Sequence, residues 1–266
     1  MQRLKPPTCP EFTAIPAMRE AALALGTEGL RRLGAEVGRQ LAAVGFNLDF
    51  APVLDIDTNP DNPIIGARAF GATQQIVSNS ALVFASGLAD GGILPCGKHF
   101  PGHGDTDIDS HLALPVLRHG RERLEAVELA PFRAAVASGM PLLMTAHIVY
   151  AALDAELPAT LSPKVVPELL RGALGYDGVV ITDDLEMKAI AERFDVDAVA
   201  RGVLAADVDL LLVCHEVGLA EELAGALAHA TSPASEARAR ARVARLRGLA
   251  RDHALVASAQ VPPRLV

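Results

Sequence analysis

Five short apolar segments alternate along the chain with longer segments whose apolar positions recur at helical spacing. The apolar segments are rich in Val, Ile and Leu, and they occupy residues 46–57, 91–100, 140–150, 177–185 and 208–216. A run of a few residues that is apolar on both faces is typical of a strand buried in a parallel sheet. The alternation of such strands with helices therefore predicts an α/β fold.

The segments between the strands predict helices. Residues 27–45 end at Gly45, a residue that commonly stops a helix, and residues 162–176 begin with Ser162 as N-cap and Pro163 at the first helical position. The same spacing of apolar positions predicts helices over residues 121–140, 196–206, 218–230 and 232–253. The last of these is long and basic.

Polar residues stand at the C-terminal end of every predicted strand. They are Asp55, Asp57, Lys98, His99, His147, Asp183, Asp184 and His215. In a (β/α)8 barrel the active site forms at that end, from several strands at once. A doubly wound nucleotide-binding sheet uses one glycine-rich turn instead, and neither GxGxxG nor GxxxxGK[ST] occurs here. We therefore expect a (β/α)8 TIM barrel.

The number of strands qualifies this expectation. Five strands are predicted where the barrel needs eight, and the first residues read as a loop that enters a helix. We expect residues 1–266 to be a single catalytic domain that lacks the N-terminal part of its barrel, with about five βα units remaining.

Composition and charge narrow the choice of partners. The chain is 50% hydrophobic and 21% charged, which is typical of a globular protein, and its net charge of −8 includes no basic stripe for nucleic acid. No apolar run approaches the roughly 20 residues of a membrane span, and residues 1–12 lack the apolar core of a signal peptide. We expect a cytoplasmic monomer without a nucleic-acid or membrane partner.

A metal site is not expected from the His- and Asp-rich segment GKHFPGHGDTDIDSHLALP, residues 97–115. Its acids at positions 105, 107 and 109 have the spacing of a calcium loop, but Ser110 and Val116 stand where that loop needs Gly and Glu. His99 and His103 are separated by Pro and Gly, so they cannot share a helical face as in HExxH. The three cysteines lack CxxC spacing, which gives neither a zinc motif nor a disulfide framework.

Acid–base chemistry fits the same segment better. Asp109 lies two residues from His111, and a carboxylate that accepts a hydrogen bond from an imidazole fixes its tautomer and favours its cation. The strand at residues 177–185 ends in two adjacent acids, Asp183 and Asp184, which point in opposite directions on an extended chain. One of them would face a pocket while the other caps the next turn, although both could be caps.

Two cations complete the candidate site. Arg68 lies in the turn-rich segment NPDNPIIGARAFG, where its planar guanidinium could bind sugar hydroxyls or a carboxylate, or simply face solvent. Lys98 ends a buried strand, and a lysine is so rarely buried in an apolar core that it should face a polar pocket. A carboxylate paired with a proton donor is the arrangement that cleaves glycosides.

Together these motifs resemble the β-N-acetylhexosaminidases of glycoside hydrolase family 3. That family carries KHFPGHGDT, DSH and then [ST]D[DAS]LxM, and this chain reads KHFPGHGDTDIDSH followed by TDDLEM. The segments NLDFAPVLDI, IIGARAFG and LLVC also match, so the resemblance extends over essentially the whole chain. It implies a (β/α)8 barrel that needs no cofactor and hydrolyses terminal β-linked N-acetylglucosamine with retention, by way of a glycosyl-enzyme intermediate.

The resemblance also implies roles for particular residues. Asp183 matches the nucleophile, and His111 matches the acid/base, with Asp109 as its partner. The residues that match those holding the sugar are Arg68, Lys98 and His99. The implied substrate is a small carbohydrate, an N-acetylglucosaminyl disaccharide or muropeptide from cell-wall (peptidoglycan) recycling.

One motif of the family is incomplete. The opening MQRL resembles the last residues of the family motif DxEGGxVxR, which would make Arg3 a further sugar ligand, but the Asp of that motif and its strand are absent. We expect the 266-residue chain alone to be poorly soluble or inactive, and a longer parent to be active.

Three alternatives stay open. A histidine acid/base carries no negative charge, so it would admit phosphate as acceptor and allow a phosphorylase. A β-glucosidase of the same family is a second possibility, which the intact GDTDIDSH disfavours. The third is a remnant that binds sugar without turnover.

Overall fold

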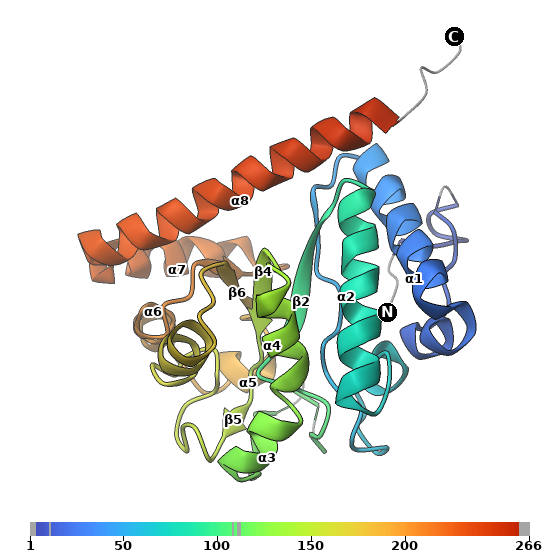
Figure 1. The fold of residues 1–266 in the computed structure, drawn as a ribbon. Helices are drawn as coiled ribbons and strands as arrows, with labels where there is room; N and C mark the ends of the chain where they lie inside the picture. Colours follow the sequence, from blue (N-terminus) through green and yellow to red (C-terminus); the bar gives the residue numbers. More distant parts are fainter. Residues whose placement is uncertain (1–3, 11, 108, 111–112, 261–266) are drawn as a thin grey trace.

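Five parallel strands form the central sheet of the computed structural model, which describes residues 4–10, 12–107, 109–110 and 113–260 (Figure 1). Their order across the sheet is the order of the chain, namely β1 (Leu48–Asp49), β2 (Leu94–Phe100), β4 (Leu142–Thr145), β6 (Val179–Asp184) and β7 (Leu210–Leu212). Each strand lies within one of the five predicted segments. Successive strands are added across the sheet in one direction, which never reverses. The sheet is therefore the curled, singly wound kind found in barrels rather than a doubly wound sheet. The predicted α/β barrel fold with five βα units is confirmed over the described residues.

Helices connect the strands. They are α1 (Met18–Ala43), α2 (Gln74–Asp90), α3 (Arg121–Ala126), α4 (Ala130–Ala137), α5 (Lys188–Ala191), α6 (Val196–Ala205), α7 (Val217–Ala230) and α8 (Pro233–Gln260), with short 3₁₀ and π-helical segments η1 (Gly66–Arg68) and η2 (Val165–Ala173). A second, two-stranded sheet pairs β3 (Val116–Leu117) with β5 (Val149–Tyr150) in parallel.

The structure corrects two of the predicted helices and extends a third. The helix predicted from Thr27 follows a non-helical Gly26, where φ is 59°, and a helical piece that was not predicted precedes it from Met18, so that α1 is kinked at Gly26. The helix predicted over residues 121–140 is split into α3 and α4. Ser162 is not the N-cap of η2, because its hydroxyl donates to Asp154 and accepts only from the N–H of Lys164, before the helix begins.

Helix α2 was not predicted, and it packs closely on α1 (Figure 1). Its segment QQIVSNSALVFASGLAD mixes Ser, Asn and Gly into the apolar pattern, which weakens the helical signal. The glycines have a packing role: an added Cβ at Gly87 would lie 2.2 Å from the carbonyl oxygen of Arg31 on α1. A tight α1–α2 pair results, and α2 leads directly into β2.

Helix α8 lies across the end of the sheet where the strands begin (Figure 1). Arg245 on α8 donates to the carbonyl of Asp177, just before β6, and His253 bonds the carbonyl of Ala89, just before β2. Leu246 packs against the small apolar cluster on the inner face of the strands. The opposite end of the sheet, where the strands finish, therefore carries the polar side chains. None of the described helices is both long enough and apolar enough to cross a membrane.

Candidate active site

Asp183 lies near the C-terminal end of β6 on the inner face of the sheet. Side chains alternate along a strand, so Asp183 shares a face with Val179 and Ile181, which belong to the inner apolar cluster. Its side chain is 22% exposed, and its Oδ1 accepts the N–H of Asp184 at 2.9 Å. Burial by itself would raise the pKa of the carboxyl, but the nearby His99 and His147 and this N–H hold the pKa below its ordinary value. Asp183 is therefore an ionised carboxylate that is open to solvent on one side.

Asp184 has the opposite orientation. Its Oδ1 accepts the N–H of Glu186 at 3.2 Å, so it caps the turn that precedes α5. Its backbone carbonyl accepts a hydrogen bond from Nε2 of His147, at 3.0 Å, and His147 is buried just after β4. The expectation that the two acids have separate positions, one facing inward and one capping, agrees with these contacts.

Lys98 and Arg68 bring positive charge to the same end of the sheet. Lys98 stands at alternate spacing from Leu94 and Cys96 of the inner cluster, which places it on the inner face. Burial, then the charge of Arg68, lowers the pKa of Lys98, while Asp183 opposes this shift. Arg68 ends η1, and its guanidinium donates to the carbonyl of Ile64 at 3.0 Å. Arg68, Lys98 and Asp183 therefore belong to one electrostatic neighbourhood.

His99 connects this group to Asp55, a buried acid that the sequence predicts only as a strand-end residue. Nδ1 of His99 lies 2.7 Å from Oδ2 of Asp55, and Nε2 lies 3.8 Å from Oδ2 of Asp183. Asp55 is completely buried. Burial would raise the pKa of Asp55, but the charge of His99 and its hydrogen bond keep that pKa below the ordinary value. The signal in the sequence was an acid inside the apolar run FAPVLDI.

The loop after β2 is held by a buried polar network around His103. The ring of His103 lies 2.9 Å from Thr106 Oγ1 through Nδ1 and 2.9 Å from Ser110 Oγ through Nε2. The side-chain amide of Asn62 donates to the carbonyls of His103 and Gly104, at 2.9 and 3.1 Å. Burial, with the nearby His99, lowers the pKa of His103 to about 4, so this ring is neutral at pH 7. His103 therefore fixes the shape of the loop that leads to Asp109.

Of the other predicted site residues, the structure describes only Asp109. Asp109 is half-buried, and its carbonyl accepts the N–H of Ala113 at 3.1 Å. His111 and Arg3 lie outside the described residues, and their predicted roles stay predictions. Of the seven predicted residues, the structure brings Asp183, His99, Lys98 and Arg68 into contact or electrostatic range of one another.

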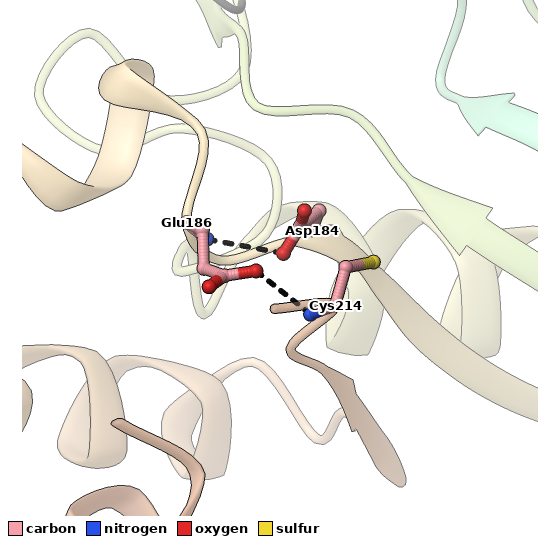
Figure 2. Close-up of side chains that lie close together, drawn as sticks. All are labelled: Asp184, Glu186 and Cys214. Atoms are coloured by element: carbon pink, nitrogen blue, oxygen red, sulfur yellow. Dashed lines mark hydrogen bonds between the residues drawn. The ribbon is translucent and has the colours of Figure 1, made fainter. Parts of the chain in front are cut away.

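One group of potential metal ligands occurs in the described part of the chain, formed by Asp184, Glu186 and Cys214 (Figure 2). The Glu186 carboxylate already accepts three backbone N–H groups, those of Cys214, His215 and Glu216, at 2.7–2.8 Å. These hydrogen bonds lower the pKa of Glu186 to about 2 against the effect of its burial. Burial and Asp184 raise the pKa of the Cys214 thiol to about 11, whereas a metal ligand must be a thiolate. These contacts favour a structural role for the three residues, in a turn that joins β6 to the end of β7, over a metal site.

The sheet is parallel and singly wound, and carboxylates and cations lie where its strands end. This arrangement defines an α/β-barrel protein whose site lies at the face formed by the C-terminal ends of the strands. Residues 7–249 match the family described as "Glycosyl hydrolase family 3 N terminal domain", and the chain belongs to this family.

Similar proteins come from several bacteria. A protein named Beta-hexosaminidase from Bordetella parapertussis is 41% identical over 222 residues, which cover 80% of this chain and 61% of that protein. A Beta-hexosaminidase from Neisseria meningitidis serogroup C is 39% identical over 220 residues, covering 80% and 60%. A solved family 3 beta-N-acetylglucosaminidase from Paenibacillus sp. superposes with a TM-score of 0.87 at 40% identity, over 96% of this chain and 49% of that one. The match spans about three-fifths of the length of these curated relatives.

Proposed function

We propose that the chain is the catalytic part of a retaining β-N-acetylhexosaminidase, which removes terminal β-linked N-acetylglucosamine from a small carbohydrate. The observation that carries this proposal is Asp183, an ionised carboxylate held beside His99 and Lys98 at the face where barrel enzymes bind substrate. Two relatives at about 40% identity that carry the name Beta-hexosaminidase support it.

The reaction would have two steps. In the first, an oxygen of Asp183 bonds to the anomeric carbon while the bond to the leaving oxygen breaks and the acid/base protonates that oxygen. In the second, water attacks the same carbon, the acid/base takes its proton, and Asp183 is released. The transition states are oxocarbenium-like and positive, so the ionised carboxylate stabilises them directly.

His111, with Asp109 as its partner, is the proposed acid/base. An imidazole can donate a proton in the first step and accept one in the second, because its ordinary pKa lies near neutrality. The proposed sugar ligands are Arg68, Lys98, His99 and Arg3. For His99, the contact with Asp55 occupies Nδ1, so only Nε2 is available to a hydroxyl group.

A substitution at Asp183 tests the proposal. The assay is nitrophenol release from p-nitrophenyl N-acetyl-β-glucosaminide, and Asp183→Asn should lower kcat/KM by about 10³-fold or more, because the amide cannot form the ester. Asp184→Asn is the matched control: it changes the adjacent acid, which caps a turn, and Asn caps as well as Asp does. In a protein that shows turnover in this assay, equal activity before and after Asp183→Asn would contradict the assignment.

The same assay separates the other candidate reactions. Added phosphate should leave the product as free N-acetylglucosamine, whereas a phosphorylase would form the sugar 1-phosphate. Faster cleavage of the nitrophenyl glucoside would indicate a β-glucosidase, and binding of N-acetylglucosamine without turnover would indicate a remnant. We further propose a muropeptide-derived disaccharide in the cytoplasm as the natural substrate, which the resemblance of the KHFPGHGDT and TDDLEM segments supports. Comparing its kcat/KM with that of chitobiose tests this choice.

A further inference from the structure

Asp55 lies beneath the candidate active site, and its carboxylate is completely buried in the described structure. Oδ1 accepts the backbone N–H groups of His99 and His103, at 3.1 and 2.7 Å, and Oδ2 lies 2.7 Å from Nδ1 of His99. A carboxylate that is ionised only accepts hydrogen bonds, so the hydrogen in this last contact belongs to Nδ1. The tautomer of His99 is thereby fixed.

The second nitrogen of His99 is directed at the proposed nucleophile. Nε2 lies 3.8 Å from Oδ2 of Asp183, so the imidazole stands between two carboxylates, one in the segment after β1 and one on β6. The ring of His99 is almost fully buried, and that of His103 packs edge-on against it with centroids 5.6 Å apart. Packing and the Asp55 contact together leave the ring one orientation. The His99 ring therefore links Asp55 to Asp183.

We propose that Asp55 is a positioning residue for the nucleophile: it holds the His99 ring so that Nε2 faces the carboxylate of Asp183. Asp55 itself touches no substrate. The inference rests on the proposed function for its kinetic consequence, but the link from Asp55 through His99 to Asp183 is measurable without turnover.

Asp55→Asn should change which ring nitrogen of His99 carries the hydrogen. The amide oxygen is the atom that can accept the two backbone N–H groups, so the NH₂ group must face Nδ1 of His99. Nδ1 of His99 then has to accept a hydrogen bond from this NH₂ group, so the ring hydrogen moves to Nε2. A cationic ring is excluded, because its Nδ1–H would meet the NH₂ group, and both are donors. The shape of the site is kept while the tautomer is reversed, and kcat/KM should fall roughly 10- to 100-fold.

A double-mutant cycle distinguishes positioning from structural damage. Asp55→Asn is measured alone and together with His99→Gln, and its effect on kcat/KM should disappear in the His99→Gln background. Asp154→Asn is the matched control, because Asp154 is also a buried carboxylate that accepts a hydroxyl and two backbone N–H groups but does not contact His99. It should lower stability and leave kcat/KM unchanged. Equal losses from Asp55→Asn in both backgrounds would overturn the proposal.

Nuclear magnetic resonance provides the test that needs no activity. The ¹⁵N signals of His99, assigned by their loss in His99→Gln, should show a protonated Nδ1 in the unchanged chain and a protonated Nε2 in Asp55→Asn. The ¹³C carboxyl signal of Asp183, assigned through Asp183→Asn, should shift in Asp55→Asn and not in Asp154→Asn. An unshifted Asp183 signal overturns the proposal whether or not sugar is hydrolysed. Absence of hydrolysis together with both expected shifts would instead refute the proposed function alone.

Discussion

The protonation state of each residue at this site is set by its immediate neighbours. Asp183 stays ionised because His99, His147 and one N–H group outweigh the effect of its burial. His103 is neutral, because it is enclosed and its two ring nitrogens contact hydroxyl groups rather than carboxylates. Two histidines four positions apart therefore have different roles: His99, at the end of β2, faces the proposed nucleophile, and His103 supports the loop that follows β2.

The neutral His103 predicts a dependence of stability on pH. Its pKa is lowered from 6.5 to about 4 in the folded chain, so the unfolded chain binds more protons between these values. The free energy of unfolding should therefore fall as the pH is lowered from 6.5 towards 4, by on the order of 3 kcal/mol from this group. Urea unfolding at several pH values measures the slope.

His103→Gln should reduce that slope, because the amide does not titrate. His229→Gln is the control, since His229 is exposed on α7 and bonds only the carbonyl of Gly225. If His103→Gln kept the full slope of the unchanged chain, other groups would account for it and the neutral His103 would be contradicted.

At the scale of elements, the contact between α1 and α2 sets the position of β2 and hence of Lys98 and His99. The two helices approach so closely that backbone of one meets backbone of the other at Gly34, Gly38, Gly87 and Gly91. Small residues are needed there for lack of space, not for an unusual backbone angle. This packing stabilises a helix whose own sequence predicts it only weakly.

Substitution of one of these glycines should separate the helices. Gly87→Ala places a Cβ 2.2 Å from the Arg31 carbonyl oxygen, and we expect a loss of about 1–3 kcal/mol in the free energy of unfolding. Gly225→Ala on α7 is the matched control, because nothing lies within 4 Å of its added Cβ. Alanine is the better helix former, so this variant should be stabilised by about 0.5–1 kcal/mol. Denaturant unfolding that ranked the two variants in the reverse order would contradict the packing described.

Across the whole molecule, α8 ties the beginnings of the strands together while the site occupies their ends. The connection is ionic as well as apolar: Arg242 is 6% exposed, donates to Asp207 at 2.9 Å, and lies 3.3 Å from Asp209, whose side chain is 1% exposed. Arg171 also binds Asp209, from η2. The order of the barrel strands is thus secured from the face opposite the catalytic groups.

Removal of Arg242 should loosen α8. Arg242→Ala leaves buried acids with one cation fewer, and we expect a loss of about 3 kcal/mol and faster amide hydrogen exchange in α8. Arg240→Ala removes an exposed i,i+4 pair with Glu236 and should cost no more than about 0.5 kcal/mol. Unchanged exchange in α8 of Arg242→Ala would show that apolar contacts alone hold the helix.

The sequence by itself determined the strands, their parallel arrangement and the chemistry at their ends, because apolar runs and strand-end polar residues are local patterns. Alternation along a strand indicated that the two adjacent acids point in opposite directions without saying which one faces inward, and the family resemblance pointed to Asp183. Only the tertiary structure decided that Asp183 faces His99, that Asp55 holds the other side of that ring, and that α2 is a helix. These features depend on atoms from segments 44 or more residues apart along the chain, which come together only when the sheet forms. No local pattern encodes such contacts.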